Sequence, residues 1–321
     1  MNQQSDVEAV DAFGKKYREL SDEVKKVIIG QEDIIEDALI SIFSRGHCLL
    51  IGVPGLAKTL LVNTIAQTLG LTYSRIQFTP DLMPSDIIGT DILDENRNFK
   101  FIKGPLFANI ILADEINRTP PKTQSALLEA MQERAATVGG KRYELGNPFF
   151  VLATQNPIEQ EGTYPLPEAQ LDRFMFNILV EYPEYKDELQ VVKNTTYDRD
   201  VQLKKILNAE EILSFQNLVR KIPVADNVME FAVKLATSSR PQNSNAPAVV
   251  KDYVVWGAGP RASQYLAIGA KCHAALHGKY SPDIEDVKAV ALPIMRHRII
   301  RNYKAEAEGI TVDTIISQLL K

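Results

Sequence analysis

The sequence contains little cysteine, and this excludes a fold held together by disulfide bonds. Its 321 residues include two cysteines, Cys48 and Cys272, too few for a disulfide framework. No apolar run approaches the roughly 20 residues that a membrane-spanning helix needs. Residues 1–10 are polar and acidic, and they lack the apolar core of a signal peptide. We therefore expect a cytoplasmic protein without a membrane span.

Other absences narrow the class of function. The chain has a net charge of −5 and an isoelectric point of about 5.6, and it contains no Lys/Arg-rich block. This argues weakly against a dedicated nucleic-acid binder. The sequence has neither an HExxH motif nor a Gly-x-Ser-x-Gly motif, so a metalloprotease or an esterase has no support.

The sequence does contain a glycine-rich loop between the apolar run Cys48–Ile51 and the amphipathic segment Leu60–Leu69. A strand, a loop and a helix in this order are the context of a phosphate-binding loop. Lys58 would reach the β- and γ-phosphates, and the Thr59 hydroxyl would ligate Mg²⁺. Backbone N–H groups and the helix N-terminus would surround the phosphate oxygens. The predicted loop consists of Gly52, Val53, Pro54, Gly55, Leu56, Ala57, Lys58 and Thr59.

Ala57 departs from the strict pattern, which has glycine before the lysine. Alanine is the smallest residue that still has a Cβ atom, so the departure is tolerable. An ordinary strand–turn–helix unit with a capping lysine is the alternative interpretation. We place Leu60, the first residue after the loop, in the predicted nucleotide-binding set as well.

A second phosphate-site signature is the apolar run Asn109–Ala113, which is followed by Asp114 and Glu115. Asp114 would hold Mg²⁺ through water, and Glu115 would polarise the water that attacks the γ-phosphate. Alone, such a pair could be a solvated strand end. Because the two signatures stand in the correct order about 55 residues apart, together they predict ATP or GTP binding.

Three further polar residues are candidates for contacts with the nucleotide. Asn156 ends an apolar run, where it could orient the attacking water or form a turn before a proline. Arg173 precedes the last predicted strand, and it could pair with Asp172 or Glu168 or project to a phosphate on a neighbouring subunit. Arg261 lies at the start of a predicted helix. It could be a plain surface residue, or it could contact a phosphate from a lid.

Apolar runs that alternate with helical periodicity predict an α/β fold with a mostly parallel sheet between helices. Two β-hairpins interrupt this pattern, at 91–102 and 136–145. Helices are predicted at 1–25, over a segment around 34–42 and at 121–134. The predicted strands are 48–51, 72–78, 109–113, 149–154 and 175–180.

The pattern changes near residue 183, which we take as the boundary between a domain at 1–183 and a helical domain at 184–321. Residues 238–259 are predicted to be the longest irregular connection. A cluster of basic residues near the end of this domain is predicted to be a solvated helix face or a patch for an acidic partner. His273 and His277 share a helix face beside Cys272 but do not by themselves predict a metal site. The basic cluster consists of Arg296, Arg298, Arg301 and Lys304. The predicted helices of this half are 184–196, 208–220, 226–240, 260–278, 282–300 and 311–321.

Together these segments resemble the AAA+ ATPases, and among them the MoxR type. Most of the matching motifs lie between about residues 27 and 183. Beyond residue 183 the resemblance rests on GPRAS (259–263) and helical periodicity. It implies a P-loop parallel sheet sandwiched by helices, the AAA+ core, followed by an all-helical lid domain. The motifs that carry it are GVPGLAKT (52–59), IILADEINRTPPKTQSALLEAMQE (110–133), LATQNP (152–157) and EGTYPLPEAQLDRFMF (161–176).

The resemblance implies roles for individual residues. Asn156 is similar to sensor 1 and Arg261 to sensor 2, and Arg173 is placed like the arginine finger that acts on the adjacent subunit's nucleotide. Lys58 and Thr59 match Walker A, and Asp114 and Glu115 match Walker B. Ile29, Gly30 and Gln31 fall where such proteins contact adenine.

The resemblance also implies a Mg²⁺-dependent ATPase that forms a homo-oligomer, a hexameric ring. Such rings act as chaperone-like remodellers of protein clients, often with partners that carry a von Willebrand factor A domain. The two predicted hairpins would be the pore-facing insertions of this group.

Three functions remain open at this point: an ATP-hydrolysing ring that remodels or assembles protein clients, a nucleotide-dependent switch or scaffold with little turnover, and a nucleic-acid motor. Glu115 argues against the switch, since a switch has no need of a water-activating carboxylate. The acidic isoelectric point and the lack of an appended DNA-binding module argue against the motor. We therefore expect the first function.

Overall fold

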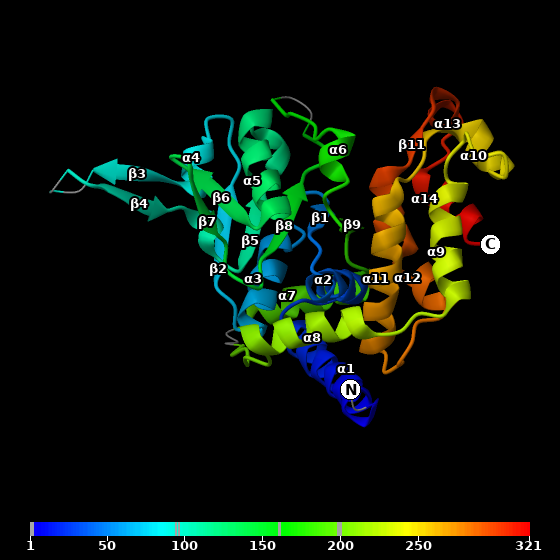
Figure 1. Ribbon diagram of the computed structural model, residues 1–321, viewed down its shortest axis with the longest axis horizontal. Helices are drawn as coiled ribbons and strands as arrows, with labels where there is room; N and C mark the ends of the chain where they lie inside the picture. Colours follow the sequence, from blue (N-terminus) through cyan, green and yellow to red (C-terminus); the bar gives the residue numbers. More distant parts are fainter. Residues whose placement is uncertain (1–2, 94, 96, 160–161, 198–200) are drawn as a thin grey trace.

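A five-stranded sheet in the order β2-β5-β8-β1-β9 forms the centre of the molecule (Figure 1). All neighbouring strands are parallel, as predicted. The computed structural model describes residues 3–93, 95, 97–159, 162–197 and 201–321; residues 1, 2, 94, 96 and 161 of the predicted segments lie outside it. The strands are β1 (Cys48–Ile51), β2 (Tyr73–Gln77), β5 (Ile110–Asp114), β8 (Phe150–Gln155) and β9 (Phe176–Leu179).

Helices cover both faces of the sheet because successive side chains of each strand point to opposite sides. Leu49 belongs to a hydrophobic cluster with side chains of α4 and α5, whereas Leu50 belongs to a cluster with side chains of α1, α2 and α3. Both leucines are fully buried. The helices are α1 (Gln3–Lys25), α2 (Glu32–Phe43), α3 (Lys58–Thr68), α4 (Pro84–Ile88) and α5 (Pro121–Glu133).

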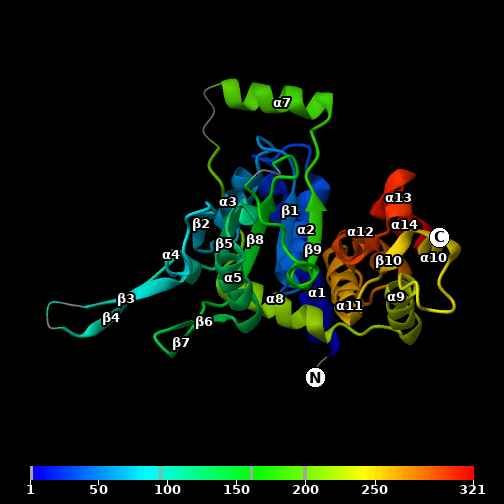
Figure 2. The same cartoon turned by 90° about the horizontal axis from the view of Figure 1, so that it is seen from above.

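Both predicted hairpins are present. They project from the side of the sheet that carries β2, away from β9 (Figure 2). The first pairs β3 (Gly89–Leu93) with β4 (Phe99–Lys103), and the second pairs β6 (Ala135–Val138) with β7 (Lys141–Glu144). They are therefore arms that stand out from the core and not part of its sheet.

The second half of the chain is helical, as predicted, but it adds a two-stranded antiparallel pair, β10 (Val254–Trp256) with β11 (Ile300–Arg301). Residues 238–259 are thus not irregular throughout, because they contain α10 and β10. The predicted helix 282–300 ends at Met295, two residues after Pro293, which removes a helical hydrogen bond. The helices are α6 (Glu168–Leu171), before β9, then α7 (Tyr185–Thr196), α8 (Ala209–Lys221), α9 (Asp226–Ser238), α10 (Ala248–Tyr253), α11 (Pro260–Leu276), α12 (Ile284–Met295), α13 (Tyr303–Ala307) and α14 (Val312–Leu319).

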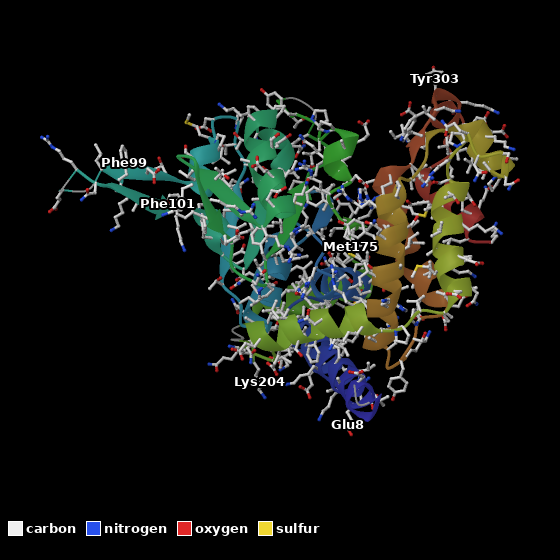
Figure 3. All side chains as sticks on the ribbon, viewed as in Figure 1. Glu8, Phe99, Phe101, Met175, Lys204 and Tyr303 are labelled. Atoms are coloured by element: carbon white, nitrogen blue, oxygen red, sulfur yellow. The ribbon has the colours of Figure 1, made fainter. Side chains whose placement is uncertain are left out.

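The helical lid packs beside the β9 edge of the sheet, with α11 and α12 nearest to the core (Figures 1 and 2). Met175, just before β9, lies between the core and the lid (Figure 3). It belongs to the same hydrophobic cluster as Leu266 of α11 and Ile294 of α12. Core and lid therefore share one hydrophobic interior. Among the described residues, no helix has the length and apolar character to cross a bilayer.

Arg298 is buried, so the prediction that the basic cluster is a solvated face was wrong at this position. The residue is 6% exposed. Its guanidinium donates to Asp172 Oδ1 at 2.7 Å and to the carbonyl oxygens of Phe174 at 2.6 Å and Met175 at 3.2 Å. Helical periodicity could not reveal this, because Asp172 lies 126 residues away in the sequence.

Replacing Arg298 with alanine is expected to lower the free energy of unfolding by at least about 1.5–3 kcal/mol, the contribution of one hydrogen bond to a charged group. The change removes a donor from Asp172 Oδ1 and from four backbone carbonyl oxygens, those of Asp172, Phe174, Met175 and Ile294, while Arg261 still pairs with Asp172 Oδ2. Urea denaturation followed by circular dichroism measures the difference. Lys304→Ala is the control, because Lys304 is exposed in the same basic cluster; its ammonium lies 5.1 Å from the Tyr253 ring centre, so the change should cost no more than about 1 kcal/mol. Equal effects of the two substitutions would contradict the structural role of Arg298.

Candidate functional site

The predicted phosphate loop connects β1 to α3 at the carboxyl edge of the sheet. A Cβ atom on Gly52 would lie 2.7 Å from the Val180 carbonyl oxygen, so no larger residue fits without a shift. Gly55 and Ala57 have φ angles of 88° and 54°, in the left-handed region. Ala57 thus has a backbone conformation that glycine adopts more readily, which explains why the strict pattern has glycine here. Alanine tolerates it at a cost of roughly 1–2 kcal/mol.

Lys58 points back into the loop. Its ammonium group donates to the carbonyl oxygen of Gly52 and, at 2.8 Å, to that of Val53. Burial lowers the pKa of Lys58, while the negative charges of Asp114 and Glu115 act in the opposite direction. The two predicted half-sites therefore lie close enough to interact. Lys58 and the loop N–H groups form a cradle that suits an anion.

Asp114 ends β5 next to the loop, and two side chains orient its carboxylate. Thr154 of β8 donates to Oδ1 at 2.7 Å, and Arg75 of β2 donates to Oδ2 at 2.6 and 3.0 Å. Neither partner is predicted from the sequence. No local signal marks Arg75, because its contact arises from the parallel register, which places Gln77 opposite Asp114 and Arg75 two residues earlier on the same face.

Glu115 follows Asp114 with a φ of 57°, which turns its side chain out of the strand. Its Oε2 accepts from Gln77 Nε2 at 3.1 Å and from Arg118 Nη1 at 3.0 Å. Its backbone N–H donates to the Thr154 hydroxyl at 2.8 Å. Thr154 therefore links the two acidic residues, and Gln77 and Arg118 hold the one predicted to activate water.

Asn156 directly follows β8, which lies between β1 and β5 in the sheet. It is buried, and its Oδ1 accepts from the Ile158 N–H at 3.1 Å. This contact is the turn that sequence analysis considered as the alternative. Asn156 also lies beside both phosphate-site signatures, as a sensor residue must. Its sensor role stays a prediction.

A small cavity lies beside the phosphate loop. Its volume is about 120 Å³, and Ile29 and Gln31 line it together with the loop residue Leu56 and with Leu60. Gln31 Nε2 also donates to the Leu56 carbonyl oxygen at 3.3 Å. Val191 of α7 borders the cavity as well, which sequence analysis did not foresee. Ile29 and Gln31, two of the three residues predicted to contact adenine, thus lie next to the residues predicted to contact phosphate, whereas Gly30 does not line the cavity.

Arg173 and Arg261 lie at the opposite edge of the sheet. Arg173 precedes β9, whose first residue Phe176 is paired with Cys48, the first residue of β1. The loop follows the last residue of β1, and a strand of this length spans about 13 Å. Arg261, in the first turn of α11, pairs with Asp172 at 3.0 Å. Neither arginine therefore lies beside the phosphate loop of its own chain.

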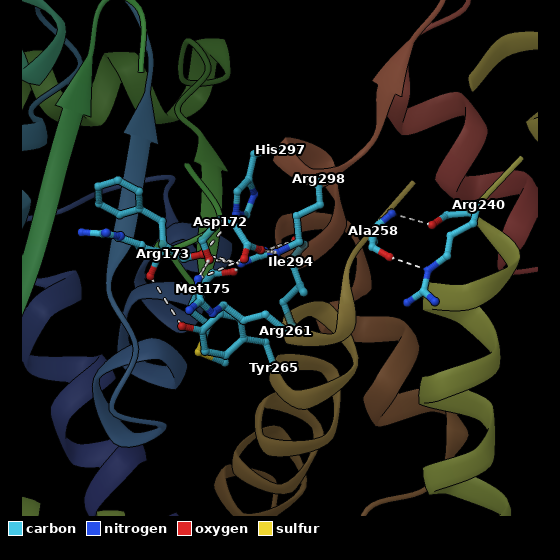
Figure 4. A network of polar contacts seen from close by, with 12 residues as sticks. Asp172, Arg173, Met175, Arg240, Ala258, Arg261, Tyr265, Ile294, His297 and Arg298 are labelled. Atoms are coloured by element: carbon cyan, nitrogen blue, oxygen red, sulfur yellow. Dashed lines mark hydrogen bonds and ion pairs between the residues drawn. The ribbon is translucent and has the colours of Figure 1, made fainter. Parts of the chain in front are cut away.

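Four arginines collect around a cavity of about 200 Å³ at this amino edge of the sheet. Burial lowers the pKa of Arg45, and so do neighbouring arginine charges. Among the described residues Arg173 makes no ion pair, and its side chain points away from Asp172, whereas Arg261 and Arg298 point toward that carboxylate (Figure 4). Such an accumulation of positive charge favours contact with an anion. The four arginines are Arg45, Arg134, Arg173 and Arg261.

The parallel sheet, the glycine-rich loop after β1, the two acidic residues at the end of β5 and the helical lid define a P-loop nucleotide-binding protein of the AAA type. Residues 47–176 match the family described as "ATPase family associated with various cellular activities (AAA)", and residues 247–319 match the AAA lid domain. These matches do not test the predicted boundary at residue 183, which stays a prediction.

Relatives define the family more narrowly. The chain is 43% identical to Chaperone MoxR1 of Mycobacterium tuberculosis over 93% of its own length and 79% of that protein. It is 30% identical to Protein MoxR of Methylorubrum extorquens over 86% of its length and 85% of that protein. The crystal structure of a candidate ATPase from Cytophaga hutchinsonii has a TM-score of 0.92 and 46% identity, with 99% and 97% of the two chains covered. The chain belongs to the MoxR-type AAA+ ATPases.

Replacing Lys58 with alanine is expected to abolish tight nucleotide binding, because Lys58 supplies the cation of the loop. Charge-assisted hydrogen bonds contribute about 1.5–3 kcal/mol each, so the loss of one weakens binding at least about tenfold. Isothermal titration calorimetry with ATP measures the effect. Lys122→Ala, which removes an exposed lysine from α5, is the control and should bind like the wild type. Affinity near that of the wild type in Lys58→Ala would refute the loop assignment.

Proposed function

We propose that the protein is a Mg²⁺-dependent ATPase that works as a hexameric ring, in which one subunit binds ATP and its neighbour completes the site. The observation that carries this proposal is the separation of the phosphate loop, at the carboxyl edge of the sheet, from Arg173 and Arg261, at the amino edge. Head-to-tail contacts in a closed ring bring one edge of a subunit to a different edge of the next. Arg173 and Arg261 would then both act in trans.

The residues at the carboxyl edge fit ATP with Mg²⁺. Lys58 and the loop N–H groups would contact the phosphates, and the cavity beside Gln31 would receive adenine. Thr59 and Asp114 would hold the ion, with Thr154 orienting the Asp114 carboxylate through its hydrogen bond. Mg²⁺ would neutralise phosphate charge and position the γ-phosphate for transfer to water.

Glu115 would orient the attacking water, and Asn156 would lie beside it as a sensor. Gln77 and Arg118 both donate to Oε2 of Glu115, and the other carboxylate oxygen, Oε1, would then accept the proton from water. Gln77 and Arg118 are thus positioning residues for Glu115. A second candidate function is a nucleotide-dependent switch with little turnover, in which the Arg118 contact would hold the Glu115 carboxylate away from water.

The hairpin β3–β4 offers an apolar surface for protein clients. Phe99 is 78% exposed and Leu93 is 60% exposed, and Figure 3 shows Phe99 on the arm that projects from the core. Exposed apolar side chains that are clustered in this way mark contact sites for other proteins. A chaperone-like remodelling role agrees with the name of the relative Chaperone MoxR1. Partners with a von Willebrand factor A domain remain part of the proposal through the family resemblance alone.

Replacing Glu115 with glutamine separates the ATPase from the switch. The amide keeps the size of the side chain but cannot accept a proton from water, so hydrolysis should fall by about 10²–10⁴-fold while ATP stays bound. Steady-state phosphate release and retention of labelled ATP on the protein measure the two effects. A pull-down with this variant, analysed by mass spectrometry, should enrich the protein client.

Glu129→Gln is the matched control, since Glu129 is exposed on α5 and should leave turnover unchanged. Turnover of Glu115→Gln at the level of the wild type would show that another group activates water, and Glu133 would be the next residue to test. If the wild-type ring itself hydrolyses ATP slowly, and Glu115→Gln hydrolyses it at the same slow rate, the result would favour the switch.

Replacing Arg173 with alanine tests the shared site. Arginine fingers supplied in trans contribute about 10³–10⁵-fold to the rate of phosphoryl transfer, so Arg173→Ala should bind ATP but lose most hydrolysis. Mixing it with an equal amount of Lys58→Ala should restore activity, because about a quarter of the interfaces then join an intact loop to an intact arginine. Phosphate release by each variant and by the mixture measures this.

Arg18→Ala, which removes an exposed arginine from α1, should behave like the wild type in every mixture. Sedimentation must show that each variant enters rings. If rings form and the mixture stays inactive, Arg173 does not act in trans. Activity that persists on dilution to proven monomers would refute the ring itself.

A further inference from the structure

Glu36 of α2 and two histidines of α11 bring potential metal ligands together where the core meets the lid. Glu36 Oε1 lies 3.5 Å from His273 Nε2 and 3.8 Å from His277 Nε2. The three ligand atoms all lie within 4.8 Å of one another. In a tetrahedral Zn²⁺ site with bonds of about 2.1 Å, ligand atoms are about 3.4 Å apart. Small side-chain movements would therefore place one ion between them.

Hydrogen bonds at the other ring nitrogens orient both imidazoles. His277 Nδ1 lies 2.9 Å from the His273 carbonyl oxygen, which can only accept, so Nδ1 donates. His273 Nδ1 lies 2.7 Å from the carboxylate of Asp286. When both rings are neutral and their Nδ1 atoms carry the proton, each Nε2 atom has a lone pair that faces Glu36 Oε1. Three acceptor atoms thus converge, and a cation between them would satisfy all three.

The surroundings support the same ligand set. Asp286 is fully buried, and Lys279 and the Asp283 N–H hold its carboxylate at 3.1 and 2.8 Å. Burial acts to raise the pKa of Asp286, but the hydrogen bond from His273 and these further contacts outweigh it and lower the pKa to about 2. Tyr17 donates to Glu36 Oε2 at 2.9 Å, which leaves Oε1 for an ion. A carboxylate behind a histidine is the arrangement that orients metal-bound imidazoles.

Access and ligand type indicate the class of ion. A cavity of about 510 Å³ is lined by Glu36 and His273 and opens a path to the cluster. Two imidazoles and a carboxylate suit Zn²⁺ or Co²⁺, whereas Mg²⁺ prefers oxygen ligands. The clustered ligand atoms belong to Glu36, His273 and His277 and do not include the Cys272 thiol.

We propose that Glu36, His273 and His277 bind one borderline divalent cation of the Zn²⁺ class, with water completing its coordination, and that this ion fastens α11 of the lid to α2 of the core. The site is separate from the predicted Mg²⁺ site at Thr59 and Asp114. Metal binding at this site does not depend on ATP hydrolysis, so the proposal can be tested independently of the proposed ATPase function.

Titration of the nucleotide-free full chain with Zn²⁺, in excess Mg²⁺, tests the site by calorimetry. The wild type should bind one equivalent, and Glu36→Gln and His277→Gln should each weaken binding at least about tenfold, the lower end of what even outer partners of a metal contribute. Glu32→Gln is the matched control, because Glu32 is exposed one turn earlier on α2, and it should bind like the wild type. Bound Co²⁺ should show visible absorption of a four-coordinate site without a thiolate charge-transfer band.

Thermal unfolding provides a second measurement. Without metal, His277→Gln should melt within a few degrees of the wild type, because the His277 side chain is 43% exposed and lies at the surface. With Zn²⁺, the melting temperature should rise for the wild type and Glu32→Gln but not for Glu36→Gln or His277→Gln. Failure of the wild type to bind one equivalent would overturn the proposal. So would equal Zn²⁺ affinity in the wild type and both ligand variants.

Discussion

All five strands of the central sheet run in the same direction, and this constraint decides where each functional group lies. Groups that follow a strand collect at the carboxyl edge, where the loop after β1, Asp114 after β5 and Asn156 after β8 meet. Groups that precede a strand collect at the amino edge, as Arg173 does before β9. One chain thus presents a nucleotide cradle on one side and a cationic surface on the other. In the proposed ring, a complete site would therefore require two copies.

Asp172 joins this surface to the lid. Its carboxylate receives Arg298 on Oδ1 and Arg261 on Oδ2, at 2.7 and 3.0 Å, so both of its oxygens are occupied by cations of the lid. Arg173, the next residue, is therefore free of the pairing that its neighbour would otherwise provide. Tyr265 of α11 lies under this network, with its ring 5.1 Å from the Arg298 guanidinium. The position of the lid and the orientation of the predicted finger are consequently set by the same contacts.

The sequence predicted the elements whose signals are local, and it missed the contacts between distant segments. The strands, the hairpins and the loop at Lys58 follow from apolar runs and turn residues that are neighbours in the chain. Arg75 gave no such signal, because its role arises only when β2 pairs with β5. Arg298 looked like a surface residue because helical periodicity does not show its partner Asp172. His273 and His277 share a helix face that the sequence shows, but their third partner, Glu36, lies more than half the chain away.

Helix α11 connects these features physically. It begins beside Arg261 and ends just before His277, and its 17 residues rise about 25 Å along the axis. Ala262, Leu266 and Ala270 are fully buried along its length, so it packs as a stiff element against core and lid alike. A rotation of α11 that freed Arg261 from Asp172 would also move His273 and His277 relative to Glu36. The contacts at the two ends of α11 are therefore joined by one continuous helix that is packed along its length.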